Sequence, residues 1–431
     1  MKQWIWLLAV APLFWGCFGP SADNSEKTLA LCTDGIDNDA NGDMDCEDAS
    51  CAAFCSTTSV DDVIIAPARY SFGIQPSTVN MTRQYKLFNA WLANHYEEDA
   101  TQNYARIRFQ SQSNTDIQGR TIGRNHTVSE GIAYGMLILV AMDTLPNRFN
   151  RLWNYYVAHE DNQGLMHWMT YLFEIDPAQS GSASDADLDA ATALLLAQKK
   201  WGDAAGTTMY FDASNILMES IRNYEIDVNS HLAPGDGWGN SGVTVKNPGY
   251  TATGAMKAFA LASGNTTWNT LVAANYDQVA QCQNPKTGVI PDWCYSSETT
   301  TADTNTYGRS HDFYMEAVRM PWRLALDYYW YGSAEAKALN QKFADYLYSA
   351  TAGDLTRLSQ GYTWAGMQMT GTATPMFLGT YALLFSQDPT KQAQVDNLYA
   401  STIAKDIPGY YESSLQLIFT STLAGLLPRP Y

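Results

Sequence analysis

The stretch Val128–Met142 limits most strongly what this chain can fold into. From Ile132 to Met142 it is apolar on every side of a helix and contains no proline. A helix without a polar face has to be enclosed by other elements, so the pattern predicts a buried central helix. Glu130 precedes this apolar run. Against an apolar wall its pKa should be raised, as a general acid requires, whereas a favourable interaction with the helix dipole is the alternative explanation.

Further stretches with helical spacing of apolar residues follow from about residue 65 onwards. They lie at 78–95, 148–159, 184–201, 212–225, 249–263, 266–281, 315–332, 334–350, 373–386, 389–404 and 411–425. No sustained alternation predicts a long strand, although short hairpins in loops remain possible. About twelve helices around a buried set predict an all-α domain over residues 65–431. They are consistent with an (α/α)6 barrel, but helix number alone also allows an irregular bundle.

The composition excludes one class of partner and suggests another. A net charge of -18 argues against nucleic acid, because phosphates would be repelled. The 13 Trp and 26 Tyr either fill the core or line a groove, where flat rings with a polar edge suit sugars. The aromatic rings thus favour a sugar as partner only if they line a groove. We expect the protein to be a monomer.

Residues 1–17 have the features of an export signal. Lys2 supplies the positive charge, and the apolar stretch from Trp4 to Trp15 is too short to span a bilayer. Gly16 before Cys17 resembles a bacterial lipoprotein cleavage site, although Phe14 and Trp15 match that pattern poorly. We expect Cys17 to be lipidated and the protein to be extracellular or on the cell surface, as an outer-membrane lipoprotein that contacts the membrane only through its lipid.

Residues 18–64 are predicted to be a linker with a disulfide-rich segment, because an even number of cysteines in an exported chain indicates disulfides. We expect Cys282 to pair with Cys294, and the four N-terminal cysteines to pair among themselves: Cys32, Cys46, Cys51 and Cys55. Oxygen-bearing side chains at calcium-loop spacing surround Gly42: Asp37, Asp39, Asn41, Asp43 and Asp48. A structural calcium is expected there; a merely solvating acidic linker is the alternative.

A second group of carboxylates precedes the predicted helix at 184–201. Asp185, Asp187 and Asp189 lie at odd spacing before an apolar run. Ser184 with Asp187 resembles a capping box, and acids in a first turn suit the helix dipole. Three acids are nevertheless more than a cap requires, so a functional cluster is predicted.

The third group contains Glu316 and Arg319, which are i,i+3 on one helical face and close enough to pair. The arginine would keep Glu316 ionised while Glu130 is kept neutral. Two carboxyls pushed in opposite directions are what acid-and-base hydrolysis of a glycosidic bond needs. An ordinary helix ion pair is the alternative.

Together these segments resemble glycoside hydrolase family 8. The resemblance covers roughly residues 75–428, and its motifs follow the family's order: 129–136, 162–168, 183–201, 247–250, 291–293 and 317–322. It implies an (α/α)6 barrel and an inverting endo-hydrolase of β-1,4-linked polysaccharide that uses no cofactor for catalysis.

The resemblance also implies roles for single residues. Glu130 would protonate the leaving oxygen, and Asp185 would hold the distorted sugar beside the scissile bond. The candidates for contact with substrate, water or the base are Trp168, Trp238, Tyr250, Arg319, Asp187 and Tyr134. Among them the two tryptophans resemble stacking platforms, the Tyr250 hydroxyl would help to place water, and Arg319 would pair with the base.

Departures from the family concern the base. The family usually carries Tyr-Asp where this chain has Met315-Glu316, so the base would be a glutamate, one methylene longer. Inverting enzymes hold their carboxyl groups about 6.5–9.5 Å apart, which a glutamate meets if its backbone retreats slightly. Asp312 is the reserve catalytic candidate if the helix extends back.

Two further departures lie beside the acid. Ile132 and Ala133 replace the usual Gln and Gly, which would alter the adjacent subsite. Glucan is the expected substrate, with xylan second and chitosan third. A barrel that binds glycan without cleaving it remains the alternative.

Overall fold

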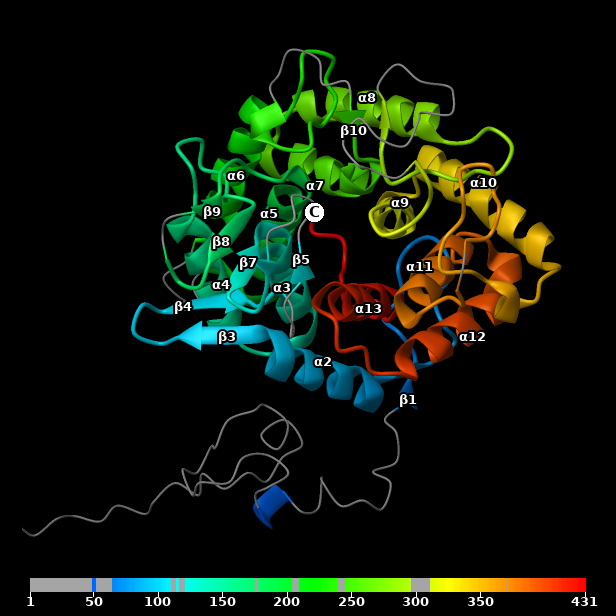
Figure 1. Ribbon diagram of the computed structural model, residues 1–431, viewed down its shortest axis with the longest axis horizontal. Helices are drawn as coiled ribbons and strands as arrows, with labels where there is room; N and C mark the ends of the chain where they lie inside the picture. Colours follow the sequence, from blue (N-terminus) through cyan, green and yellow to red (C-terminus); the bar gives the residue numbers. More distant parts are fainter. Residues whose placement is uncertain are drawn as a thin grey trace, which may run out of the picture. The chain divides into compact units, whose positions relative to one another are not determined.

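The computed structural model in Figure 1 describes residues 49–51, 64–109, 114–115, 121–174, 177–203, 209–238, 245–295, 311–369 and 371–431. The chain divides into two compact units, Met1–Asp61 and Asp62–Tyr431. Of the first, only the turn η3 (Ala49–Cys51) is described, and Cys51 is disulfide-bonded. The predictions for Cys17 and for the calcium ligands lie outside the described residues.

Twelve α-helices occur in the part of the chain that the structure describes, each at one of the predicted stretches. They are α2 (Met81–His95), α3 (Ser129–Met142), α4 (Asn147–Ala158), α5 (Ser184–Trp201), α6 (Tyr210–Tyr224), α7 (Thr253–Ser263), α8 (Thr267–Cys282), α9 (Met320–Tyr331), α10 (Ala334–Thr351), α11 (Pro375–Phe385), α12 (Gln392–Ile403) and α13 (Tyr410–Leu423). None of the described helices has the length and apolar content needed to cross a bilayer.

The odd-numbered helices form a closed inner ring. In order, α3 packs on α5, α5 on α7, α7 on α9, α9 on α11, α11 on α13, and α13 returns to α3. The even-numbered helices lie outside this ring (Figure 1). The second unit is therefore the predicted (α/α)6 barrel and not an irregular bundle.

Helix α3 shows why the inner ring needs its unusual composition. All but two of its residues, Glu130 and Ala141, are buried, because neighbours enclose it on every side. At Gly135 an added Cβ would lie 2.7 Å from the Leu152 side chain of α4, so the glycine allows close packing. The outer helix α2 is amphipathic instead, and buries Leu87 and Trp91 on one face.

Short antiparallel strands join the helices, as the sequence left possible. They are β1 (Ile64–Ile65), β2 (Val79–Asn80), β3 (Tyr96–Asp99), β4 (Tyr104–Ile107), β5 (Asn114–Thr115), β6 (Thr121–Ile122), β7 (His126–Val128), β8 (Met169–Tyr171), β9 (Pro177–Gln179), β10 (Val245–Lys246) and β11 (Cys294–Tyr295). The sheets are β1–β2, β3–β4, β5–β6, β7–β8–β9 and β10–β11. Because β7 runs directly into α3 and pairs with β8, it brings Trp168 to the start of α3, where the Trp168 carbonyl accepts from the Ser129 N–H at 3.0 Å.

Short 3-10 turns complete the connections: η5 (Asp236–Trp238), η6 (Pro248–Tyr250), η7 (Ala317–Arg319), η8 (Leu355–Arg357) and η9 (Pro389–Lys391). The predicted disulfide between Cys282 and Cys294 is present and joins the end of α8 to β11. Helices α3, α5, α9 and α13 all begin at the same end of the barrel, where their first residues meet.

Candidate active site

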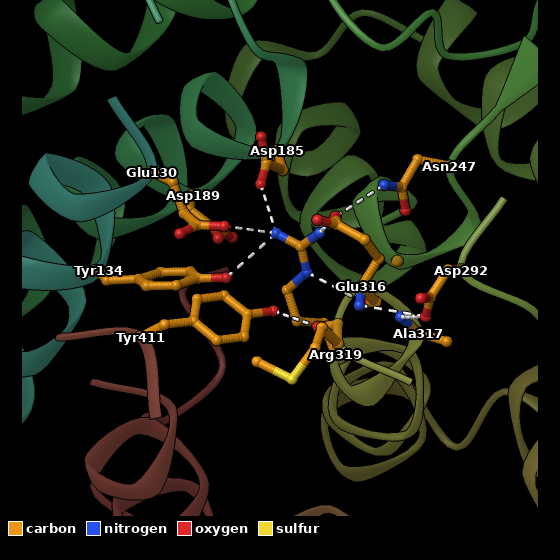
Figure 2. Close-up of polar contacts among 12 residues, drawn as sticks. Glu130, Tyr134, Asp185, Asp189, Asn247, Asp292, Glu316, Ala317, Arg319 and Tyr411 are labelled. Carbon is orange, nitrogen blue, oxygen red and sulfur yellow. Dashed lines mark hydrogen bonds and ion pairs between the residues drawn. The ribbon is translucent and has the colours of Figure 1, made fainter. Parts of the chain in front are cut away.

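Arg319 lies at the centre of a carboxylate cluster at that end of the barrel (Figure 2). Its side chain is fully buried, and Nη1 donates at 2.7 Å both to Glu130 Oε2 and to Asp185 Oδ2. Its Nη2 donates to Glu316 Oε2. The predicted pair of Glu316 and Arg319 is therefore confirmed, and the same guanidinium also binds the predicted acid and the predicted sugar-holding aspartate.

The charges of this cluster do not balance, because three carboxyls share one guanidinium. Burial raises the pKa of Glu130 to about 8; Arg319 opposes this rise, while the charges of Asp185 and Glu316 reinforce it. Burial raises the pKa of Asp185 to about 6, against the pull of Arg319 and Arg323. Glu130 thus keeps its proton near neutral pH, which confirms the raised pKa predicted from the sequence.

The carboxyls differ in access. The side chain of Glu316 is 36% exposed and that of Glu130 is 19% exposed, whereas Asp185 is 2% exposed. Asp185 Oδ1 is buried without a hydrogen-bond partner. Glu130 and Glu316 can therefore reach a molecule outside the barrel, and Asp185 offers one unused acceptor beneath them.

Two tyrosines at the start of α13 were not singled out from the sequence. Tyr410 Oη donates to Glu130 Oε1 at 2.8 Å, and Tyr411 Oη donates to the carbonyl of Met315. The only local signal is a pair of tyrosines before an apolar helix. Their partners lie at other helix starts, so sequence spacing does not reveal them.

Glu316 is held from a second side by two loop residues. Asn247 Nδ2 donates to Glu316 Oε2 at 2.9 Å. Asp292 Oδ1 accepts from the N–H groups of Tyr314, Glu316 and Ala317 at 2.9, 3.1 and 2.7 Å. Burial raises the pKa of Asp292 to about 8, although these three N–H donors oppose the rise.

The main chain at Glu316 also lies tightly against η6. A Cβ on Gly249 would come within 2.5 Å of the Glu316 carbonyl oxygen. Glycine at position 249 is therefore what permits this close approach. The backbone at the predicted base is positioned by its neighbours as well as by its own turn.

A row of aromatic rings extends outward from Arg319. The guanidinium lies over the Tyr250 ring, with Cζ 4.9 Å from the ring centroid. Tyr250 and Trp293 have centroids 6.1 Å apart, and Trp293 stacks on Trp238 at 6.2 Å. All three rings and that of Trp168 are half-buried, so part of each remains accessible. Flat, partly exposed rings suit the faces of sugars.

Two of the predicted substrate contacts have fully buried side chains in the free protein, Asp187 and Tyr134. Contact with a substrate stays a prediction for both. Asp187 instead accepts from Tyr156 Oη, and burial raises its pKa to about 8. Tyr134 Oη accepts from Arg319 Nη1 at 3.4 Å, which places it under the cluster.

The capping box considered for α5 is absent. Its N-cap is Ala183, and the Ser184 hydroxyl donates to the Ala233 carbonyl. Ile132 and Ala133 have fully buried side chains, so their predicted effect on a neighbouring subsite would act through the packing of α3.

Asp312 is not brought to the cluster by a continuous helix. Residues 311–316 form bends and a turn around an isolated bridge at Phe313, and α9 begins only at Met320, after η7. The Asp312 carboxylate accepts from the Trp364 N–H at 3.0 Å. Asp312 is the reserve candidate only if the helix of Glu316 extends back to it, and the helix does not.

Comparisons with known proteins agree with this geometry. The sequence model of the glycosyl hydrolases family 8 matches residues 88–423. Endoglucanase A of Acetivibrio thermocellus is 32% identical over 355 residues, which cover 79% of this chain and 68% of that protein. Endoglucanase 2 of Ruminiclostridium josui is 30% identical over 347 residues, which cover 79% of this chain and 70% of that protein.

Among solved structures, the apo form of the β-1,3-1,4-glucanase from Paenibacillus sp. X4 has the same fold. The TM-score is 0.73 at 23% identity, over 83% of this chain and 97% of the other. At that identity the likeness concerns the arrangement of helices alone.

Proposed function

The chain belongs to glycosyl hydrolase family 8 and is a glycoside hydrolase, and from that premise we propose that it cleaves internal β-1,4 linkages of a β-glucan with inversion. The observation that carries the proposal is the asymmetry around Arg319. One partly exposed carboxyl, Glu130, has its pKa raised to about 8, while the more exposed Glu316 is held by Arg319 and Asn247. A protonated carboxyl and an ionised one on either side of the glycosidic bond are what the reaction requires.

In the proposed reaction Glu130 gives its proton to the glycosidic oxygen as the bond from that oxygen to the anomeric carbon breaks. A water attacks the anomeric carbon from the opposite face, and its proton passes to Glu316. Asp185 Oδ1 has no hydrogen-bond partner in the free protein. In the complex it accepts a hydrogen bond from a hydroxyl of the sugar next to the scissile bond. Exchange with solvent then returns Glu130 to its acid form and Glu316 to its base form.

The choice of glucan rests on two supports. The two relatives at 30% and 32% identity are named endoglucanases. The aromatic row of Tyr250, Trp293 and Trp238 offers the flat surface that an extended β-linked chain can follow. Xylan remains the second candidate substrate, because it differs from glucan by one hydroxymethyl group per sugar.

The test combines a substrate panel with stereochemistry. Reducing-sugar release should be highest on β-glucan or carboxymethylcellulose and lower on xylan. Proton NMR of fresh product should show the α-anomer first. A β-anomer would exclude inversion, and release from xylan alone would exclude the glucan assignment.

We also propose that residues 1–17 direct export, that Cys17 carries a lipid, and that the loop from Asp37 to Asp48 binds calcium. The proposal rests on the sequence pattern. Membrane fractionation with a labelled fatty acid should place the protein in the lipid-modified fraction, and Cys17→Ser should release it. A calcium titration of the full chain, with Asp39→Ala as the comparison, tests the loop.

A further inference from the structure

We propose that Asn247 and Asp292 are positioning residues for Glu316, and that the Cys282–Cys294 disulfide holds the small sheet β10–β11 that carries both of them. The inference rests on the proposed function, because Glu316 acquires its importance as the base. It assigns to the disulfide a part in the reaction in addition to its part in stability.

The two anchors act on different parts of Glu316. Asn247 donates to the carboxylate oxygen Oε2, the same oxygen that Arg319 binds, and so limits where the carboxylate can turn. Asp292 accepts hydrogen bonds from three N–H groups within four residues, those of Tyr314, Glu316 and Ala317. It therefore fixes the main chain around Glu316. The Glu316 side chain has three carbons and several rotatable bonds, and the main chain of the turn before α9 binds this residue only through the Arg319 N–H, which donates to the Glu316 carbonyl at 3.4 Å. Both restraints therefore add to its positioning.

Both anchors emerge from the same end of one short ladder. Lys246 of β10 pairs with Cys294 of β11 in antiparallel register. One step further along such a ladder, residue 247 comes opposite residue 293, next to Asp292. The position of Asn247 relative to Asp292 is therefore set by the pairing of β10 with β11.

The ladder itself is too short to be stable alone, because each strand has two residues. Two fastenings hold it. The disulfide ties Cys294 of β11 to Cys282 at the end of α8. On β10, Lys246 forms a buried ion pair with Asp227 at 2.7 Å. The disulfide is thus a covalent link from the barrel helix α8 to the strand that follows Asp292.

The first experiment replaces Asn247. In Asn247→Ala we expect kcat to fall about tenfold to a hundredfold, the range for losing a hydrogen bond to a charged group. KM should change little, and the acid limb of the pH profile should move to higher pH, because the ionised form of Glu316 loses a donor. Asn275→Ala, which removes another buried asparagine away from the site, should lower stability while leaving the pH profile unchanged.

The second experiment compares two changes at Asp292. Asp292→Asn keeps an oxygen that can accept the three N–H groups, and should retain most of kcat. Asp292→Ala removes that oxygen and should lower kcat at least tenfold more than Asp292→Asn. Equal activities of the two variants would show that Asp292 does not act through these hydrogen bonds.

The third experiment removes the disulfide by Cys282→Ser with Cys294→Ser, which spares any disulfide near the N-terminus. We expect kcat to fall about threefold to thirtyfold at a temperature well below unfolding, with the acid limb displaced as in Asn247→Ala. In the Asn247→Ala background, removing the disulfide should lower kcat by a much smaller factor, because both changes act through the hydrogen bond from Asn247 to Glu316. A purely structural disulfide predicts an unchanged acid limb and additive losses, and either result would overturn the inference.

Glu316→Gln separates the two possible failures. If it retains wild-type kcat, Glu316 is not the base and the proposed assignment fails. If it is inactive while Asn247→Ala keeps both wild-type kcat and the acid limb, the positioning inference alone is wrong. Should the double serine variant fail to fold, Asn247→Ala still decides, because it leaves the disulfide in place.

Discussion

Arg319 and Arg323 stand one helical turn apart and face the same helix, yet their surroundings differ. Arg323 binds both carboxylate oxygens of Asp189, and both side chains are 3% exposed. Arg319 faces Asp185, four residues before Asp189, but it also binds Glu130 and Glu316. We call Arg323 with Asp189 the lower layer, and Arg319 with its three carboxyls the upper layer. The lower layer is a neutral bidentate pair, whereas the upper layer has three carboxyls for one cation.

The difference shows what separates a structural ion pair from a reactive site in this barrel. In the lower layer the charges of Arg323 and Asp189 cancel, and both carboxylate oxygens accept from the guanidinium. Neither side chain therefore needs to bind or lose a proton. In the upper layer one carboxyl has to remain protonated, and two of the three reach solvent. Charge balance, more than helix geometry, distinguishes the two layers.

The largest effect is expected from the acid of the upper layer. Glu130→Gln keeps the hydrogen bonds possible but removes the transferable proton, so kcat should fall about 10²- to 10⁴-fold. Circular dichroism should show a folded protein. Activity within threefold of wild type would mean that the upper layer is as inert as the lower one.

A comparable loss is expected at the base. Glu316→Gln should reduce kcat about 10²- to 10⁴-fold, because no carboxylate then takes the proton from water. Asp312→Asn, whose carboxylate bonds the Trp364 N–H, should stay within a few-fold of wild type. The opposite ranking of the two kcat values would transfer the base assignment to Asp312.

The lower layer should respond in stability and not in chemistry. Asp189→Ala leaves Arg323 buried without its partner, which costs about 3–5 kcal/mol of unfolding free energy. Denaturant unfolding measures this loss, and kcat per folded molecule at low temperature should change only a few-fold. A large loss of kcat with unchanged stability would contradict the division between the layers.

The smallest effect concerns pH and stability. Because folding raises the pKa of Glu130 from an ordinary value of 4.5 to about 8, its contribution to stability is present at low pH and is lost as pH rises from 4.5 through 8. Glu130→Gln cannot lose a proton there. Its unfolding free energy relative to wild type should therefore increase by about 1–3 kcal/mol between pH 5 and pH 9.

Thermal or denaturant unfolding of both proteins across that pH range measures the difference. In activity, the basic limb of the wild-type profile should lie near pH 8, because only the protonated form of Glu130 can act as the acid. A difference that stays constant between pH 5 and pH 9 would mean that Glu130 is already ionised in the folded protein over this range.

The amino-acid sequence by itself determined the twelve helices, the burial of α3, the raised pKa of Glu130 and the Cys282–Cys294 pair. Helical periodicity and an apolar run around one carboxylate are local properties, and a chain with few cysteines leaves few pairings. Predicted boundaries failed mainly at α9, where the chain makes bends and a 3-10 turn before Met320.

Only the tertiary structure decided which side chains share Arg319, that Asp187 turns into the core, and that Tyr410, Asn247 and Asp292 contact Glu130 and Glu316. Apart from the pair of Glu316 and Arg319, these contacts join loop residues and helix starts that are 22 to 280 positions apart in the chain. A one-dimensional pattern records neither which helices become neighbours in a closed ring nor which way a buried carboxyl turns, because both depend on the packing of the whole barrel.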